Sequence, residues 1–221
     1  MYYPYFLVNE CRCTMFRNNL KGDGVFFDLS DTSPLHDKLN FSSQNDLQNY
    51  ANQQMQKHQT NWGISAFGEY RQKMFTALGY EQMVLQKRFY HLGLDFWGAV
   101  GTSIHAPFDG TIVQSQYESG TGNYGGMIVL KITSSTTPYY IVFGHLDIDT
   151  LSIVNTTINK GDLIGHFGDM TCNGGYFHHS HIQVLTQKGY EQGYAHQGYA
   201  TRITWQNIQE YCLDPTFLLF V

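Results

Sequence analysis

The chain has 221 residues, of which 42% are hydrophobic and only 14% are charged, so it holds enough apolar material to bury a core. Its net charge is −5 and its Lys and Arg residues form no run, which argues against nucleic acid or an anionic membrane as a partner. No apolar stretch is long enough to predict a membrane span.

The first 62 residues predict an appendage whose apolar clusters are too small for a core of their own. Prolines and glycines interrupt these clusters at first, which indicates irregular structure with one or two strands. From Ser43, a capping-box-like start and apolar residues at helical spacing predict one amphipathic helix to about His58. We expect its Gln- and Asn-rich face to be solvated. The division is thus an appendage of residues 1–62, packed on the body, and a β-rich domain of residues 63–221.

The second region predicts strands joined by glycine-rich turns, with no long helix between them. The pattern is typical of a mainly β fold, with antiparallel sheets packed as a sandwich or an open barrel. A short helix is expected from Thr201 to Tyr211. The predicted strands are Ile64 to Arg71, Val84 to Leu92, Thr111 to Gln116, Met127 to Ile132, Tyr139 to His145, and His179 to Leu185.

The four cysteines, Cys11, Cys13, Cys172 and Cys212, are too few and too irregularly placed for a disulfide framework. They favour a reducing compartment. The first residues also lack the basic segment and long apolar run of a secretory signal, which indicates a cytoplasmic location. Export or a periplasmic location would require a signal that has been removed or a non-standard route.

Two histidine-containing segments draw attention as sites of chemistry. His91 and Asp95 flank Gly93 where a strand is predicted to run into a turn, and a bent strand end can aim both side chains inward. His179 and His181 are two apart on a predicted strand, so both imidazoles should share one face. His178 should face the opposite side.

The order of these motifs resembles the lysostaphin-type zinc endopeptidases, which cleave peptide bonds in bacterial cell walls. The resemblance runs from Tyr90 to Val184 and begins with His-x-Gly-x-Asp at residues 91–95. An isolated His145-Leu146 after a β run and then His-x-His at residues 179–181 complete it. Supporting pieces are Gly101-Thr102-Ser103-Ile104, Ala106-Pro107-x-x-Gly110, Asn123-Tyr124-Gly125, and Ile158-x-x-Gly161-x-x-Ile164-Gly165-x-x-Gly168.

The flanks are similar to one subgroup, the endopeptidase module that also occurs in large fusions with kinase-like and aminotransferase-like domains. The segments with counterparts there are Phe27-Asp28-Leu29-Ser30, Gly68-Glu69-x-Arg71 and Asp214-Pro215.

The resemblance implies a metal site and two further catalytic groups. His91, Asp95 and His181 would bind one Zn²⁺ per chain and leave a position open for a zinc-bound water, as catalytic zinc sites do. His145 and His179 would remove a proton and stabilise the oxyanion, with their individual roles unassigned. Gln183, on the face of the His-x-His pair, is expected to hydrogen-bond a ligating imidazole. The implied substrate is a peptide or peptidoglycan-like chain.

Two other functions fit parts of the sequence. Ala106-Pro107-Phe108-Asp109-Gly110 would suit a histidine phosphocarrier of the sugar phosphotransferase kind, but such a carrier needs neither Asp95 nor His-x-His. A non-catalytic binding or activator module of the same fold typically loses ligands, whereas all five positions stand here. Departures from the common pattern, such as Ser180 between the histidines, fall on the presumed groove walls and affect substrate identity. No feature indicates an oligomeric state.

Overall fold

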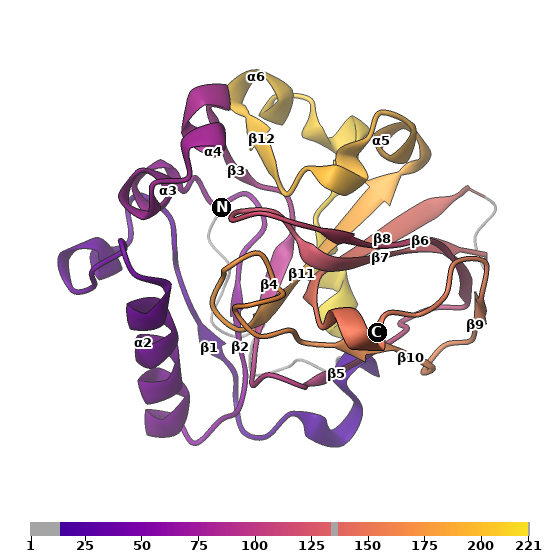
Figure 1. The fold of residues 1–221 in the computed structure, drawn as a ribbon, viewed down its shortest axis with the longest axis horizontal. Coiled ribbons are helices and arrows are strands. Elements are labelled where there is room, and N and C mark those ends of the chain that lie inside the picture. Colours follow the sequence, from indigo (N-terminus) through magenta and orange to yellow (C-terminus); the bar gives the residue numbers. More distant parts are fainter. Residues whose placement is uncertain (1–13, 134–136, 221) are drawn as a thin grey trace.

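One large sheet organises the fold (Figure 1). The computed structural model describes residues 14–133 and 137–220. Within these residues the strands of the large sheet are β1 (Val25–Phe26), β2 (Gly63–Ser65), β4 (Leu94–Trp97), β6 (Gly110–Glu118), β7 (Gly125–Ile132), β8 (Tyr139–Leu146), β9 (Thr157–Ile158), β11 (His179–Thr186) and β13 (Cys212–Leu213). They run in the order β1-β2-β4-β11-β8-β7-β6-β9, and β13 also pairs with β11. Only β1 and β2 pair in parallel, which confirms a mainly antiparallel β fold.

Two short antiparallel strand pairs lie outside the large sheet, each formed by strands far apart in the sequence. They are β5 (Ser103–His105) with β10 (Leu163–His166), and β3 (Arg88–His91) with β12 (Tyr199–Thr201). The α-helices are α2 (Gln44–Lys57), α3 (Gln72–Leu78), α4 (Glu81–Gln86), α5 (Gln187–Glu191) and α6 (Arg202–Trp205). Turns of 3₁₀ helix are η1 (Thr14–Asn19), η2 (Pro34–Asp37), η3 (Ile148–Thr150), η4 (Tyr194–His196), η5 (Ile208–Glu210) and η6 (Pro215–Phe220).

The large sheet buries both faces. One face presents alternate side chains such as Phe96, Phe143 and Ile182 to an apolar cluster that also contains Ile104 and Ile164 of β5 and β10. The opposite face carries the histidines of the His-x-His motif between two further apolar clusters. In the view of Figure 1, helices α2 and α3 lie at the left of the molecule, α4 and α6 at the top, and α5 at the upper right. Polar side chains on this second face are therefore enclosed by packed elements instead of facing open water.

The predicted N-terminal helix is confirmed, and its polar face differs from expectation. Helix α2 begins after Ser43, whose hydroxyl accepts a hydrogen bond from the Asp46 amide. Gln44 and Gln48 do not face solvent alone. Their side-chain oxygens accept from the backbone amides of Phe177 and His178, at 3.1 and 2.6 Å. The expectation of a solvated Gln face is wrong at these two positions because the helix docks on the segment before β11.

Two predicted strands are wrong in part. The strand expected from Ile64 to Arg71 is limited to β2, and α3 begins directly after Arg71. The first half of the strand expected from Val84 to Leu92 is helix α4. In the second segment Val84 favours a strand locally, but it belongs to a short helix whose buried face is Met83. Tertiary packing overrides the local preference.

The remaining expectations fare differently. The C-terminal helix expected from Thr201 to Tyr211 is broken into α6 and η5. The other four predicted strands correspond to β6, β7, β8 and β11.

Residues assigned to the appendage contact the β-rich region in several places. Strand β1 pairs with β2, and Phe16 stacks on Phe96 with ring centroids 3.9 Å apart. The division at residue 62 stays a prediction. Cys11 and Cys13 lie outside the described residues, and Cys172 and Cys212 are free thiols. No helix in the described part of the chain has the length and apolar character needed to cross a membrane.

Candidate active site

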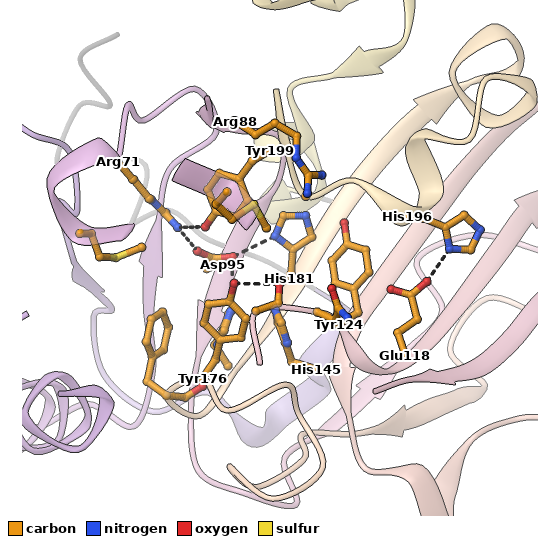
Figure 2. A pocket seen from close by; sticks show the side chains of 17 residues that line it. Arg71, Arg88, Asp95, Glu118, Tyr124, His145, Tyr176, His181, His196 and Tyr199 are labelled. Carbon is orange, nitrogen blue, oxygen red and sulfur yellow. Dashed lines mark hydrogen bonds and ion pairs between the residues drawn. The ribbon is translucent and has the colours of Figure 1, made fainter. Parts of the chain in front are cut away.

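The register of three adjacent strands assembles the site. His181 on β11 lies directly opposite Asp95 on β4 and opposite Gly144 on β8. His179, two residues before His181, points to the same side because alternate residues of a strand share a face. Both imidazoles line one pocket, together with Asp95 and His145 (Figure 2). The expectation that His-x-His forms one polar face is confirmed.

The glycine of the His-x-Gly-x-Asp motif has a packing reason. His91 ends β3 and Asp95 lies within β4, so Gly93 sits in the turn that joins two different sheets. A Cβ atom at Gly93 would lie 2.4 Å from Cε1 of His181. The absent side chain therefore lets the His181 ring pack against the turn that carries His91 and Asp95.

The three predicted metal ligands converge on one point. His91 Nε2 lies 3.0 Å from Asp95 Oδ1, and His181 Nδ1 lies 3.1 Å from the same oxygen. The two nitrogens are 3.0 Å apart. All three side chains are at most 2% exposed. Ligand atoms around a tetrahedral zinc with bonds of about 2.0–2.2 Å lie roughly 3.3–3.6 Å apart, so the observed triangle is slightly tighter than a zinc site.

Hydrogen bonds behind the ligands set which ring nitrogen faces the centre. His91 Nδ1 lies 2.7 Å from the Ala66 carbonyl oxygen, to which only an N–H can donate. His181 Nε2 lies 3.1 Å from the Gln183 side-chain oxygen and donates to it. The inward nitrogens of both neutral rings therefore carry lone pairs. Two lone pairs and a carboxylate oxygen this close repel one another unless a cation lies among them, so the donor set fits a divalent metal.

Asp95 is held from behind by a buried arginine. Arg71 Nη1 donates to Asp95 Oδ2 at 2.7 Å and to the Tyr199 hydroxyl at 2.8 Å. The guanidinium also bonds to Glu69 Oε2, at 2.8 Å from Nε and 2.7 Å from Nη2. This arrangement leaves Oδ1 of Asp95 as the oxygen that faces the two histidines. Arg71 belongs to the quoted Gly68-Glu69-x-Arg71 segment, but its contact with Asp95 was not foreseen.

Gln183 makes the contact expected of it and is itself fixed. Its side-chain oxygen accepts from His181 and from the Tyr124 hydroxyl, which lies 3.1 Å away. Its amide nitrogen donates to the Tyr194 carbonyl and to Cys212 Sγ, each at 3.3 Å. An amide with both ends engaged has one favourable orientation, so it presents an oxygen to the imidazole.

His145 and His179 lie beside the ligands with a common geometry. Each donates from Nδ1 to a backbone carbonyl, His145 to Asn173 at 2.7 Å and His179 to Phe177 at 2.8 Å. The Nε2 atom of each neutral ring is therefore a free acceptor. His179 Nε2 lies 3.6 Å from Asp95 Oδ1. The rings of His145 and His179 have centroids 4.4 Å apart.

The backbone at His145 is irregular in a way that positions the ring. His145 has a φ of 63°, a left-handed conformation that is uncommon outside glycine. Between Phe143 and Leu146, β8 carries one residue more than the facing part of β7, from Ile128 to Gly126. Such bulges redirect side chains near functional sites. The bulge thus turns His145 toward the histidines of β11.

The electrostatics favour deprotonated ligands. Burial lowers the pKa of His91 to about 3 and that of His179 to about 4, and it holds the pKa of His145 well below its usual range. Burial works to raise the pKa of Asp95, but the imidazoles and the Arg71 guanidinium around it hold that pKa well below its usual value. Metal ions bind neutral imidazole and carboxylate, so these groups are ready to act as ligands.

The remaining histidines divide between bystanders and one pocket residue. His105 lies on β5 and its Nδ1 lies 3.1 Å from the Gly161 carbonyl, away from the centre. His166 is the last residue of β10. His178 is outside the convergent group of His91, Asp95 and His181. His196, which belongs to no motif, lines the pocket and pairs with Glu118.

Other pocket residues were missed because they come from distant segments. Tyr124, Tyr176 and Tyr199 line the pocket, as does Arg88 at the start of β3 (Figure 2). Tyr124 lies in a quoted motif segment, which was the available signal. Nothing local in the sequence marks Arg88 or Tyr199.

Comparisons with known proteins bear on residues 89–192, which match the family model described as Peptidase family M23. Among solved structures, the catalytic domain of the antimicrobial peptidase lysostaphin from Staphylococcus simulans is 21% identical, with a TM-score of 0.42. That alignment covers 60% of this chain and 81% of the other. No curated protein matches this chain.

Two longer chains align over smaller shares. The antimicrobial peptidase lysostaphin from Staphylococcus simulans is 21% identical with a TM-score of 0.41, over 59% of this chain and 44% of that one. A zinc-containing peptidase from Vibrio cholerae is 22% identical with a TM-score of 0.36, over 45% of this chain and 28% of that one. This chain thus spans less than half the length of either.

Proposed function

Because residues 89–192 match the model of Peptidase family M23, we propose that this chain is a zinc-dependent endopeptidase acting on peptidoglycan-type peptides. The family assignment supports a metallopeptidase; the metal, the endopeptidase mode and the substrate are the proposed part. The observation that carries the proposal is the triangle of His91 Nε2, Asp95 Oδ1 and His181 Nδ1, whose edges are 3.0–3.1 Å. The likeness to the module found in kinase-like and aminotransferase-like fusions stays a prediction.

These three residues would hold the zinc. A zinc ion at such a site supplies a Lewis acid that lowers the pKa of a coordinated water to about 7 and polarises a carbonyl. Arg71 keeps the Asp95 carboxylate turned with Oδ1 inward, and Gln183 keeps His181 in the tautomer with Nδ1 free. The chain therefore contributes a preorganised set of donors that does not need to rearrange when substrate binds.

His145 and His179 would handle protons during amide hydrolysis. Attack of water on an amide requires removal of a proton from the water, stabilisation of the oxyanion and protonation of the leaving nitrogen. Both rings offer an unprotonated Nε2 toward the pocket while Nδ1 is anchored to the backbone. One can accept the proton of the water, and once protonated such a ring can donate to the oxyanion or to the leaving nitrogen. Their closeness suits a shared role on one tetrahedral intermediate.

The test combines metal content with hydrolysis. Purified protein should contain about one zinc per chain by elemental analysis. It should cleave a glycine-rich or wall-derived peptide at an internal peptide bond. Chelation should abolish cleavage, and added Zn²⁺ should restore it. Zinc-loaded protein that cleaves neither kind of peptide would contradict the proposal. Cleavage restricted to peptides unrelated to the cell wall would retain the peptidase and reject the substrate.

A further inference from the structure

The charged residues that line the pocket are satisfied by one another, with one exception. Arg71 bonds to Asp95 and Glu69, and Glu118 pairs with His196. Arg88 lines the same pocket and forms no ion pair with any residue that the structure describes. Its Nε atom is buried without a hydrogen-bond partner. Figure 2 shows the guanidinium end of Arg88 reaching into the pocket, apart from the Glu118–His196 pair.

The backbone around Arg88 is built to aim it inward. The preceding residue, Lys87, ends α4 in a left-handed conformation with φ of 54°. In β3, Arg88 faces Thr201 and Tyr90 faces Ala200, so Phe89 is an extra residue that forms a bulge. A regular strand would place Arg88 on the face opposite His91, because the two are three residues apart. The bulge interrupts this alternation, and Arg88 lines the pocket while His91 contacts Asp95 and His181 beneath it.

An unpartnered guanidinium in a half-buried setting is unfavourable without a ligand. Burial lowers the pKa of Arg88, yet an arginine stays charged. Tyr124 and Tyr176, which interact electrostatically with Arg88, are neutral phenols and therefore weaker acceptors than a carboxylate. The Tyr124 hydroxyl donates to Gln183, and the Tyr176 hydroxyl donates to the Gly122 carbonyl. The guanidinium therefore keeps its planar set of donors for a molecule that enters the pocket.

We propose that Arg88 binds a carboxylate of the peptide substrate and makes the enzyme selective for an anionic peptide. A carboxylate matches the planar guanidinium with two parallel hydrogen bonds, which a neutral amide cannot reproduce. The carboxylate is either an acidic side chain or a free C-terminus near the scissile amide. This inference rests on the proposed peptidase function and adds the substrate class to it.

Matched peptides test the proposal. The probes are acetyl-hexaglycine-amides in which one glycine at a time is replaced by Glu or by Gln, and acetyl-hexaglycine with a free C-terminus or an amide. Charge-assisted hydrogen bonds should give the zinc-loaded wild type an about 10- to 100-fold higher kcat/KM for one carboxylate peptide than for its neutral partner. Arg88→Gln should bring that ratio close to one by slowing the carboxylate peptide alone. Arg88→Lys should keep part of the preference.

A control variant and a binding measurement separate the possible failures. Lys57→Gln removes an exposed cation at the end of α2, outside the pocket lining, and should keep the wild-type preference. Zinc content and melting temperature should be the same in all variants. The inference is overturned if wild type shows no preference at any position, or if Arg88→Gln slows both members of a pair equally.

Binding of the same peptides to zinc-free protein, followed by titration calorimetry, distinguishes this inference from the proposed function. Arg88-dependent binding of a carboxylate peptide without any hydrolysis by the zinc-loaded protein would support the inference and reject the peptidase. Hydrolysis of carboxylate and neutral peptides at equal rates would support the peptidase and reject the inference.

Discussion

The floor and the rim of the pocket satisfy their polar groups in opposite ways. We define the floor as the buried group of His91, Asp95 and His181, of which Asp95 and His181 line the pocket, and the rim as Arg88 with the Glu118–His196 pair. Each floor residue is buried and has a hydrogen-bond partner behind it, from Ala66, Arg71 or Gln183. Rim groups are partly exposed, and Arg88 has no polar partner among the described residues. The floor groups are thus oriented by hydrogen bonds within the protein, whereas the rim leaves the guanidinium donors of Arg88 available to a ligand.

The largest effect should follow from removing a floor ligand. Asp95→Ala takes away the carboxylate oxygen shared by His91 and His181, so we expect loss of most bound zinc and of peptidase activity. Arg71 would keep its bonds to Glu69, so the sheets should remain folded. Elemental analysis and circular dichroism measure both. Full zinc occupancy in this variant would contradict the comparison, and global unfolding would give Asp95 a mainly structural role.

The next effect concerns His145 and His179, which are buried beside the floor residues. His145→Ala and His179→Ala should each lower hydrolysis by on the order of 10²-fold or more, the usual scale for a positioned acid or base or an oxyanion donor. Both variants should retain about one zinc per chain. The fold loss in hydrolysis of the double variant should be smaller than the product of the fold losses of the two single variants, since residues that act as a unit share their effect.

The exposed His58, at the end of α2, provides a matched control, and His58→Ala should keep wild-type rates. Loss of zinc from His145→Ala or from His179→Ala would identify the substituted histidine as a zinc ligand. Full activity in both single variants would show that His145 and His179 only pack within their strands and take no part in hydrolysis.

A smaller effect should come from the residue behind the floor. Arg71→Lys keeps a positive charge beside Asp95 but loses the planar fork that joins Asp95, Glu69 and Tyr199. Zinc affinity should fall by about 10- to 100-fold, as for other residues that orient metal ligands, while the protein stays folded. Competition with a fluorescent chelator measures the affinity. An unchanged affinity would show that the floor is rigid without this support.

The smallest effect should come from the rim pair. His196→Ala removes the partner of Glu118, and pairs this exposed typically contribute only about 0–1 kcal/mol. We expect an unchanged zinc content, a melting temperature within a few degrees of wild type, and a change in KM of less than about 10-fold. A loss of zinc here would mean that floor and rim are coupled and that the distinction between them fails.

Regular local patterns made part of this site predictable. A period of two placed His179 and His181 on one face, and the capping pattern at Ser43 placed α2 within a residue of its start. The motif order led to the three residues whose ligand atoms converge. These features depend on residues close together in the sequence or on the order of motifs, so they can be predicted from the sequence alone.

The unpredicted parts depend on contacts between distant residues or on irregular backbone. Arg71 and Tyr199 are 128 residues apart and meet because β3 pairs with β12 beside the pocket. Arg88 faces the pocket through a bulge that no local pattern announces. The short helix α4 ends at left-handed Lys87, and its Val84 also favours a strand, which explains the incorrect strand prediction there.

The two amide contacts from α2 support the pocket from outside the residues matched by the family model. Gln44 and Gln48 fix the backbone immediately before His179, yet they precede residue 89, where the family match begins. A segment of residues 89–192 transplanted to another scaffold would carry all three floor residues and still lack this clamp, as well as Arg71. For this chain, the segments that support the pocket therefore extend beyond the residues matched by the family model, and they include a helix that does not itself line the pocket.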